Sequence, residues 1–107
     1  MTHAKTIEKL AQEIADEVGL KVRVQAFNCA RSEKLGAQVR VRVFSPNKRQ
    51  TWSALRSLGR LLAERGAGRV FVDRDSHYET RTGVTGSCQG WATGSAADLR
   101  VYPESAS

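Results

Sequence analysis

Two valine-rich segments with strict alternation constrain the fold of this chain more than any other feature. Residues 20–28 read LKVRVQAFN and residues 37–45 read AQVRVRVFS, so apolar and polar side chains alternate along both segments. Successive side chains of a strand point to opposite faces, so each segment predicts a strand with one buried and one solvent-facing side. The polar residues ARSEKLG between them predict an antiparallel hairpin. Because both buried faces must meet the same core, the outward side chains of the two strands should share one face.

Helical periodicity flanks this hairpin on both sides. Apolar residues recur at steps of three and four across residues 4–18, and Gly19 follows as a helix stop. A second helix is expected over about residues 50–65, where leucines line one side. Ser45 is the predicted N-cap of this helix, and Pro46 fits its first position.

The C-terminal part gives a weaker pattern. Residues 69–74 and 98–102 alternate and predict two further strands, with Leu99 and Val101 facing inward in the second. The stretch between them is rich in Gly, Ser and Thr, and we expect part of it to form an irregular or edge strand, near Tyr78–Thr82 or Ser87–Ala92.

These elements predict a single domain over residues 1–107, since a chain of 107 residues suits one hydrophobic core. The expected class is α+β, with two amphipathic helices packed on one face of a mostly antiparallel sheet of four to five strands. The element order is α-β-β-α-β-(β)-β, and we expect the tail at residues 103–107 to be frayed.

Charge is unevenly distributed along the chain. Lys and Arg number 17 against 11 Asp and Glu, a net charge of +6, but residues 20–69 alone carry +10 and the segments on either side carry −2 each. No apolar run approaches the roughly 20 residues that span a bilayer, and no signal peptide opens the chain. We therefore expect a soluble cytoplasmic protein with no membrane partner, and no motif indicates a cofactor.

The first candidate site is the solvent face of the hairpin. It should gather four cations and two aromatic rings: Lys21, Arg23, Arg40, Arg42, Phe27 and Phe44. Cations bind phosphates and rings stack on bases, so this combination suits DNA or RNA. The alternative is that these charges only keep a one-sided sheet in solution. Trp91, in the Gly-rich stretch, is either a further contact residue or a lid on the core.

The polar face of the second helix is the second candidate site. Its four cations are Lys48, Arg49, Arg56 and Arg60. A helix N-terminus with nearby arginines favours anions, although an ordinary solvated helix face explains the same pattern. If this helix and the hairpin line one groove, the two candidates form a single site.

A third, weaker candidate is the run DRDSHYE. On a regular strand its alternate residues, Asp73, Asp75, His77 and Glu79, would share one face and offer ligands to a divalent metal for phosphodiester hydrolysis. No metal-binding motif supports this interpretation. We prefer a polar edge or turn here and predict no metal site.

The sequence therefore favours a small non-enzymatic binding module for DNA or RNA. The alternative is a protein–protein inhibitor or adaptor of the anti-defence type found on phages, plasmids and other mobile genetic elements. In that case arginines would meet an acidic protein surface, with Phe27, Phe44 or Trp91 as anchors. A metal-dependent nuclease is the third hypothesis, and a homodimer is compatible with all three.

Overall fold

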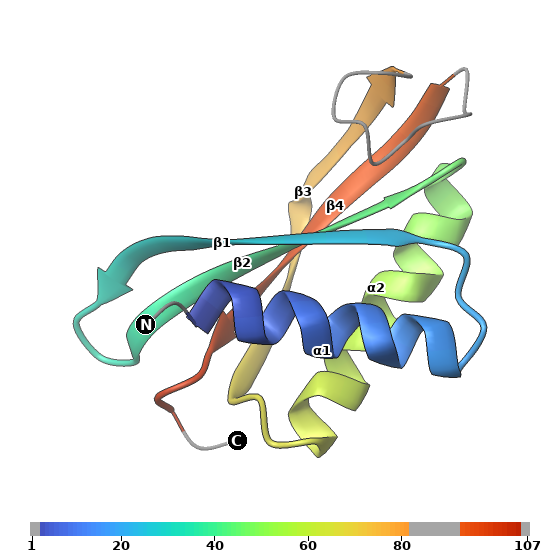
Figure 1. Cartoon of the computed structure of the whole chain (residues 1–107). Coiled ribbons are helices and arrows are strands. Elements are labelled where there is room, and N and C mark those ends of the chain that lie inside the picture. The colour runs from blue at the N-terminus through green and yellow to red at the C-terminus, as the bar shows by residue number, and fades with distance from the viewer. Residues whose placement is uncertain (1–2, 82–92, 106–107) are drawn as a thin grey trace.

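A computed structural model describes residues 3–81 and 93–105 of the chain. These residues form six elements, α1 (His3–Glu17), β1 (Arg23–Ser32), β2 (Gly36–Ser45), α2 (Lys48–Glu64), β3 (Arg69–Arg81) and β4 (Thr93–Tyr102). The strands form one antiparallel sheet in the order β1-β2-β4-β3. Both helices lie on the same side of this sheet (Figure 1). The predicted α+β class is confirmed.

The predicted hairpin is present and faces the helices with its valines. Val24 pairs with Val43, and Ala26 pairs with Val41. Val39, Val41 and Val43 are fully buried against both helices. The period-two pattern therefore fixed which side of these two strands is covered, because only one face of each carries apolar side chains.

Both helices are amphipathic, as predicted, but α2 begins differently. Its N-cap is Asn47, whose Oδ1 accepts a hydrogen bond from the Gln50 backbone N–H at 2.8 Å. The prediction of Ser45 as cap is wrong, because Ser45 is the last residue of β2. Its hydroxyl, fully buried, donates to the Asn47 carbonyl at 2.7 Å and so secures the turn from strand to helix.

The C-terminal half of the sheet is longer than the sequence predicted. β3 continues to Arg81, so it joins the strand predicted at residues 69–74 to the edge strand expected near Tyr78–Thr82, and β4 starts at Thr93 instead of Asp98. β4 lies between two strands, so both of its edges are hydrogen-bonded. Ala97 is fully buried in the core beneath the helices, and Ala96, on the other face, is fully buried against Phe44. The first residues of β4 have small side chains, so their sequence shows little alternation and did not predict a strand. The alternative strand at residues 87–92 lies outside the described part of the chain.

Residues 103–105, part of the tail expected to be frayed, are held against the hairpin. The Glu104 carboxylate accepts a hydrogen bond from Arg31 Nη2 at 2.8 Å and another from the Ala37 backbone N–H at 3.1 Å. The Ser105 carbonyl accepts one from the Arg69 backbone N–H. No helix among the described residues is long and apolar enough to cross a membrane.

Candidate polyanion-binding surfaces

The side of the sheet turned away from the helices, here called the outer sheet face, carries the predicted hairpin arginines. Arg42 pairs with Gln25 and Arg40 pairs with Phe27 across the β1–β2 ladder. Directly opposed residues point to the same face of a sheet, so the prediction that these outward side chains share one face is confirmed.

The two hairpin arginines are held by carboxylates from the other half of the sheet. Arg42 donates to both oxygens of Asp98, from Nε at 2.8 Å and from Nη2 at 3.0 Å. Arg40 Nη1 lies 3.1 Å from Asp98 Oδ2 and 3.2 Å from Asp73 Oδ2. Arg100 Nε donates to Asp73 at 2.8 Å and completes the cluster. The forked bond of Arg42 and the charge-assisted bonds of Arg40 and Arg100 hold these guanidiniums in place.

This outer-face network of Arg40, Arg42, Arg100, Asp73 and Asp98 is largely neutral. Three guanidiniums face two carboxylates, and the Asp98 side chain is only 3% exposed. Partial burial acts to lower the pKa of Arg40, but its hydrogen bond with Asp98 and nearby negative charge raise the pKa overall. The guanidiniums predicted to meet phosphate are therefore charged but already occupied by internal acids.

Aromatic rings on the two edge strands flank this network. Arg42 lies over the Phe27 ring, 5.0 Å from its centroid, and Arg100 lies over Phe71 at 5.3 Å. Phe71 also meets Tyr102 edge-on, with centroids 5.7 Å apart. Phe27 and Phe71 are each 37% exposed, so each ring combines a cation–π contact with a solvent-accessible edge.

Phe44 does not form part of this exposed set. Its position opposite Arg23 places it on the outer sheet face as predicted, but its side chain is fully buried and packs against Ala96. The small side chain of Ala96, directly across the ladder on β4, leaves room for the ring. The prediction of Phe44 as a stacking or interface residue is wrong.

The cations of α2 are in a different environment. Lys48, Arg49, Arg56 and Arg60 are all exposed, and the structure records no ion pair or hydrogen bond for their side chains within the described residues. The single acidic residue of α2 is Glu64, at its last position. This set, here called the α2 cation row, thus keeps its positive charge available.

Lys21 lies close to the start of the α2 cation row. It precedes β1, so the prediction that it belongs to the strand face is wrong. Gln50 Nε2 donates to the Lys21 carbonyl at 3.3 Å, which fixes this residue beside the first turn of α2. Lys21 is exposed.

The two cation sets do not line a common groove. The buried side of α2, including Leu55 and Leu58, packs on the inner valines of the sheet. The exposed side of α2 and the outer sheet face therefore lie on opposite sides of the molecule (Figure 1). The expectation that they might combine into one site is wrong, because the sheet separates them.

The metal candidates are divided by an irregularity in β3. The pairing of β3 with β4 shifts between Asp73 and Tyr78, so the alternation expected across DRDSHYE is broken. Asp73 lies in the outer-face network, whereas His77 stacks on Trp52 of α2 with centroids 5.9 Å apart. His77 Nε2 also lies 2.6 Å from Ser95 Oγ.

Asp75 and Glu79 are exposed. Within residues 3–81 and 93–105, no three acidic, histidine or cysteine side chains are grouped so that they could hold a metal ion.

The completion of the outer-face network by Asp73, Asp98 and Arg100 was not predicted from the sequence. The signal for Asp98 and Arg100 was present, because Leu99 and Val101 facing inward places their neighbours outward. The contact of Asp73 with Arg40 and Arg100 could be predicted only with the strand order as well. Trp91 lies outside the described residues.

Comparison with protein-family models, with curated proteins and with solved structures finds no match to this chain.

Proposed function

We propose that this protein is a non-enzymatic module that binds nucleic acid, DNA or RNA, through the α2 cation row. One observation carries the proposal: the cations of α2 have no acidic partner in the described structure, whereas Arg40, Arg42 and Arg100 of the outer sheet face do. Unpaired surface cations release counterions from phosphates on binding, and this release provides most of the affinity in non-specific complexes.

The geometry of α2 supports an elongated polyanion as the ligand. Arg49 and Arg60 are 11 positions apart, which corresponds to about 16 Å along a helix at 1.5 Å per residue. Lys48 and Arg49 lie in the first turn, which contains no acidic residue, so the positive end of the helix dipole adds to their charge. Phosphate contacts of this kind position a nucleic acid without reading its sequence, and we expect modest specificity.

Salt dependence tests this proposal. If Lys21 and the four residues of the α2 cation row each neutralise one phosphate, log affinity for duplex DNA falls against log salt with a slope of about −4.5. The measurement is fluorescence anisotropy with labelled duplex DNA, single-stranded DNA and RNA at several salt concentrations.

Two double variants with the same change in charge locate the surface. Arg56→Gln/Arg60→Gln removes two cations from α2, and the slope should become shallower by about 1.8. Arg23→Gln/Arg69→Gln removes two exposed cations from the outer sheet face and should leave the slope near the wild-type value. A flat salt dependence of the wild type, or equal loss in both variants, contradicts the proposal.

A protein partner on the outer sheet face is a second candidate. The exposed rings of Phe27 and Phe71, each fixed by an arginine, favour it, because aromatic residues and arginine are enriched at protein interfaces. This function predicts no affinity for bare oligonucleotide and a stable complex with one protein that Phe27→Ala/Phe71→Ala abolishes.

A further inference from the structure

β1 is an edge strand whose outward backbone groups are hydrogen-bonded by side chains of α1. The order β1-β2-β4-β3 gives it one neighbouring strand, so the backbone groups on its other side need partners from elsewhere. Those groups belong to alternate residues, and the outward N–H groups of Val24 and Ala26 are bonded to side chains rather than to a strand.

Two side chains of α1 provide these partners. Gln12 Oε1 accepts from the Val24 N–H at 3.1 Å, and Gln12 Nε2 donates to the Val22 carbonyl at 3.3 Å. The carboxamide of Gln12 therefore offers one acceptor and one donor to the edge, as a peptide group of a neighbouring strand would. Glu8 Oε2 accepts from the Ala26 N–H at 3.2 Å and caps the next outward position.

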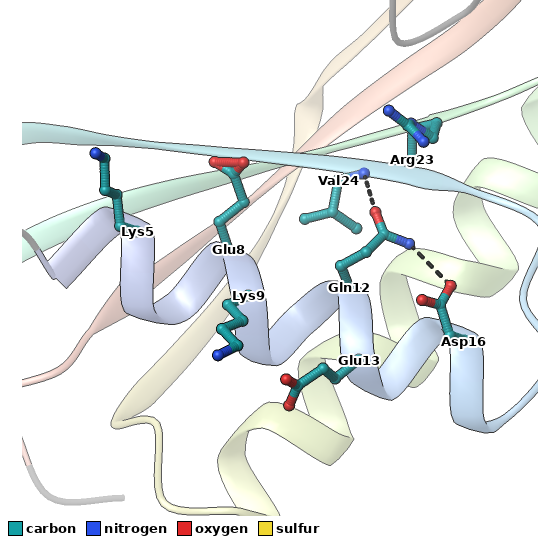
Figure 2. Close-up of a pocket in the computed structure, with 8 residues that line it drawn as sticks. All are labelled: Lys5, Glu8, Lys9, Gln12, Glu13, Asp16, Arg23 and Val24. Atoms are coloured by element: carbon teal, nitrogen blue, oxygen red, sulfur yellow. Dashed lines mark hydrogen bonds between the residues drawn. The ribbon is translucent and has the colours of Figure 1, made fainter.

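A groove of about 610 Å³ runs between α1 and this edge. Figure 2 shows Glu8 and Gln12 reaching up from α1 to the strand, with Lys5 toward one end of the groove and Arg23 toward the other. Neither Lys5 nor Arg23 has an ion-pair partner among the described residues. The acidic Glu8 is occupied by the Ala26 N–H in the middle of the edge. Lys9, Glu13 and Asp16 also line the groove, and Asp16, which accepts a hydrogen bond from Gln12 Nε2 at 3.1 Å, lies toward the Arg23 end.

We propose that this groove accepts an extended peptide segment of a partner protein as an added strand on β1, in place of the Gln12 and Glu8 side chains. Main-chain hydrogen bonds to the edge provide affinity in this mode of recognition, and flanking side chains provide selectivity. The charges specify the peptide: an acidic residue at one end faces Lys5, and the rest of the segment, which passes Glu8 and then the end shared by Asp16 and Arg23, is uncharged.

The exchange conserves hydrogen bonds at the strand edge. Val22, Val24 and Ala26 each give up a side-chain partner and gain a backbone partner, so the capping side chains compete with the peptide and lower its apparent affinity. This surface and this class of partner are separate from the α2 cation row, so the inference stands or falls independently of nucleic-acid binding.

The experiment is an NMR titration of the full chain with a capped peptide of about eight residues, a usual strand length. The probe has Glu at one end and alternating Thr and Val along the rest. We expect shifts centred on the amides of Val24 and Ala26. Gln12→Ala should tighten binding about threefold or more, because a competing group is removed. Lys5→Gln should weaken it about two- to fivefold, the range for one exposed ion pair.

Three controls separate strand addition from other binding. A probe N-methylated at alternate residues should not bind, and a probe with Lys in place of its Glu should bind more weakly than the acidic one. Arg49→Gln/Arg56→Gln should leave the affinity for the acidic probe unchanged, which excludes attraction by the α2 cation row. Equal affinity for the N-methylated probe, weaker binding by Gln12→Ala, or self-association of Gln12→Ala without affinity for the probe overturns the proposal.

Discussion

Arginine has two different roles on the two sides of this molecule. On the outer sheet face, Arg40 and Arg42 are fixed by Asp98, and the cluster is largely neutral. On α2, Arg56 and Arg60 are exposed with no recorded partner in the described residues. The position of a basic residue on a solvent-facing surface therefore does not by itself make its charge available. Availability depends on where the acids are, and here they lie on β3 and β4.

The strongest test of this difference removes the acid that both hairpin arginines share. Asp98→Ala leaves Arg40 and Arg42 without their main partner in a partly buried position. Loss of one member of a buried ion pair usually costs about 3–5 kcal/mol, and the partial exposure of these arginines places the expected loss near about 3 kcal/mol. Urea denaturation measures it. A loss below about 1 kcal/mol would mean that the network is not structural.

A matched pair of arginine substitutions compares the two sides directly. Arg42→Ala should lower the free energy of unfolding by about 1–2 kcal/mol, because it removes a two-pronged bond to Asp98 and the contact with Phe27. Arg56→Ala, on the exposed side of α2, should change it by no more than about 0.5 kcal/mol. Thermal melts of both variants measure this difference. Equal shifts in melting temperature would contradict the distinction between the outer sheet face and α2.

The irregularity in β3 contributes to the outer-face network through Ser76. Its hydroxyl donates to the Asp73 carbonyl at 2.6 Å and accepts from the Asp98 backbone N–H at 2.7 Å, so it connects the two acidic positions. Ser76→Ala leaves both backbone groups without this partner, and we expect a loss of about 1 kcal/mol. Chemical denaturation measures the free energy of unfolding of this variant. Asp75→Ala, at an exposed neighbouring position, is the control. Equal losses in the two variants would contradict this role of Ser76.

The smallest expected effect concerns an exposed ion pair at the hairpin. The hydrogen bond from Arg31, followed by the Ala37 backbone N–H, holds the pKa of Glu104 below its usual value. A carboxyl with a depressed pKa in the folded state stabilises the protein above its unfolded pKa. That stability is lost as pH falls below about 4.5 and through the folded pKa. Arg31→Gln should reduce this acid sensitivity in melts between about pH 3 and 6, and an unchanged pH profile would contradict it.

Much of the fold could be predicted from the sequence, because most of its signals are local. The alternation of residues 20–28 and 37–45 predicted the hairpin and its buried side, and the helical period predicted α1 and α2. β4 escaped prediction at its N-terminal end because its short side chains at Ala96 and Ala97 give little periodic contrast. The candidate site residues were predicted less accurately than the fold, since Phe44 is buried and Lys21 precedes β1.

By itself, the sequence determined which side chains face the helices and which face away, since strand and helix periods are set by backbone geometry within a few residues. Only the tertiary structure decided which of the outward cations are neutralised. Asp73 and Asp98 lie 33 and 58 positions along the chain from Arg40, and only the pairing of β4 between β2 and β3 brings them into contact. Electrostatic interactions depend on distance in space, and a local pattern contains no information about partners that arrive from another strand.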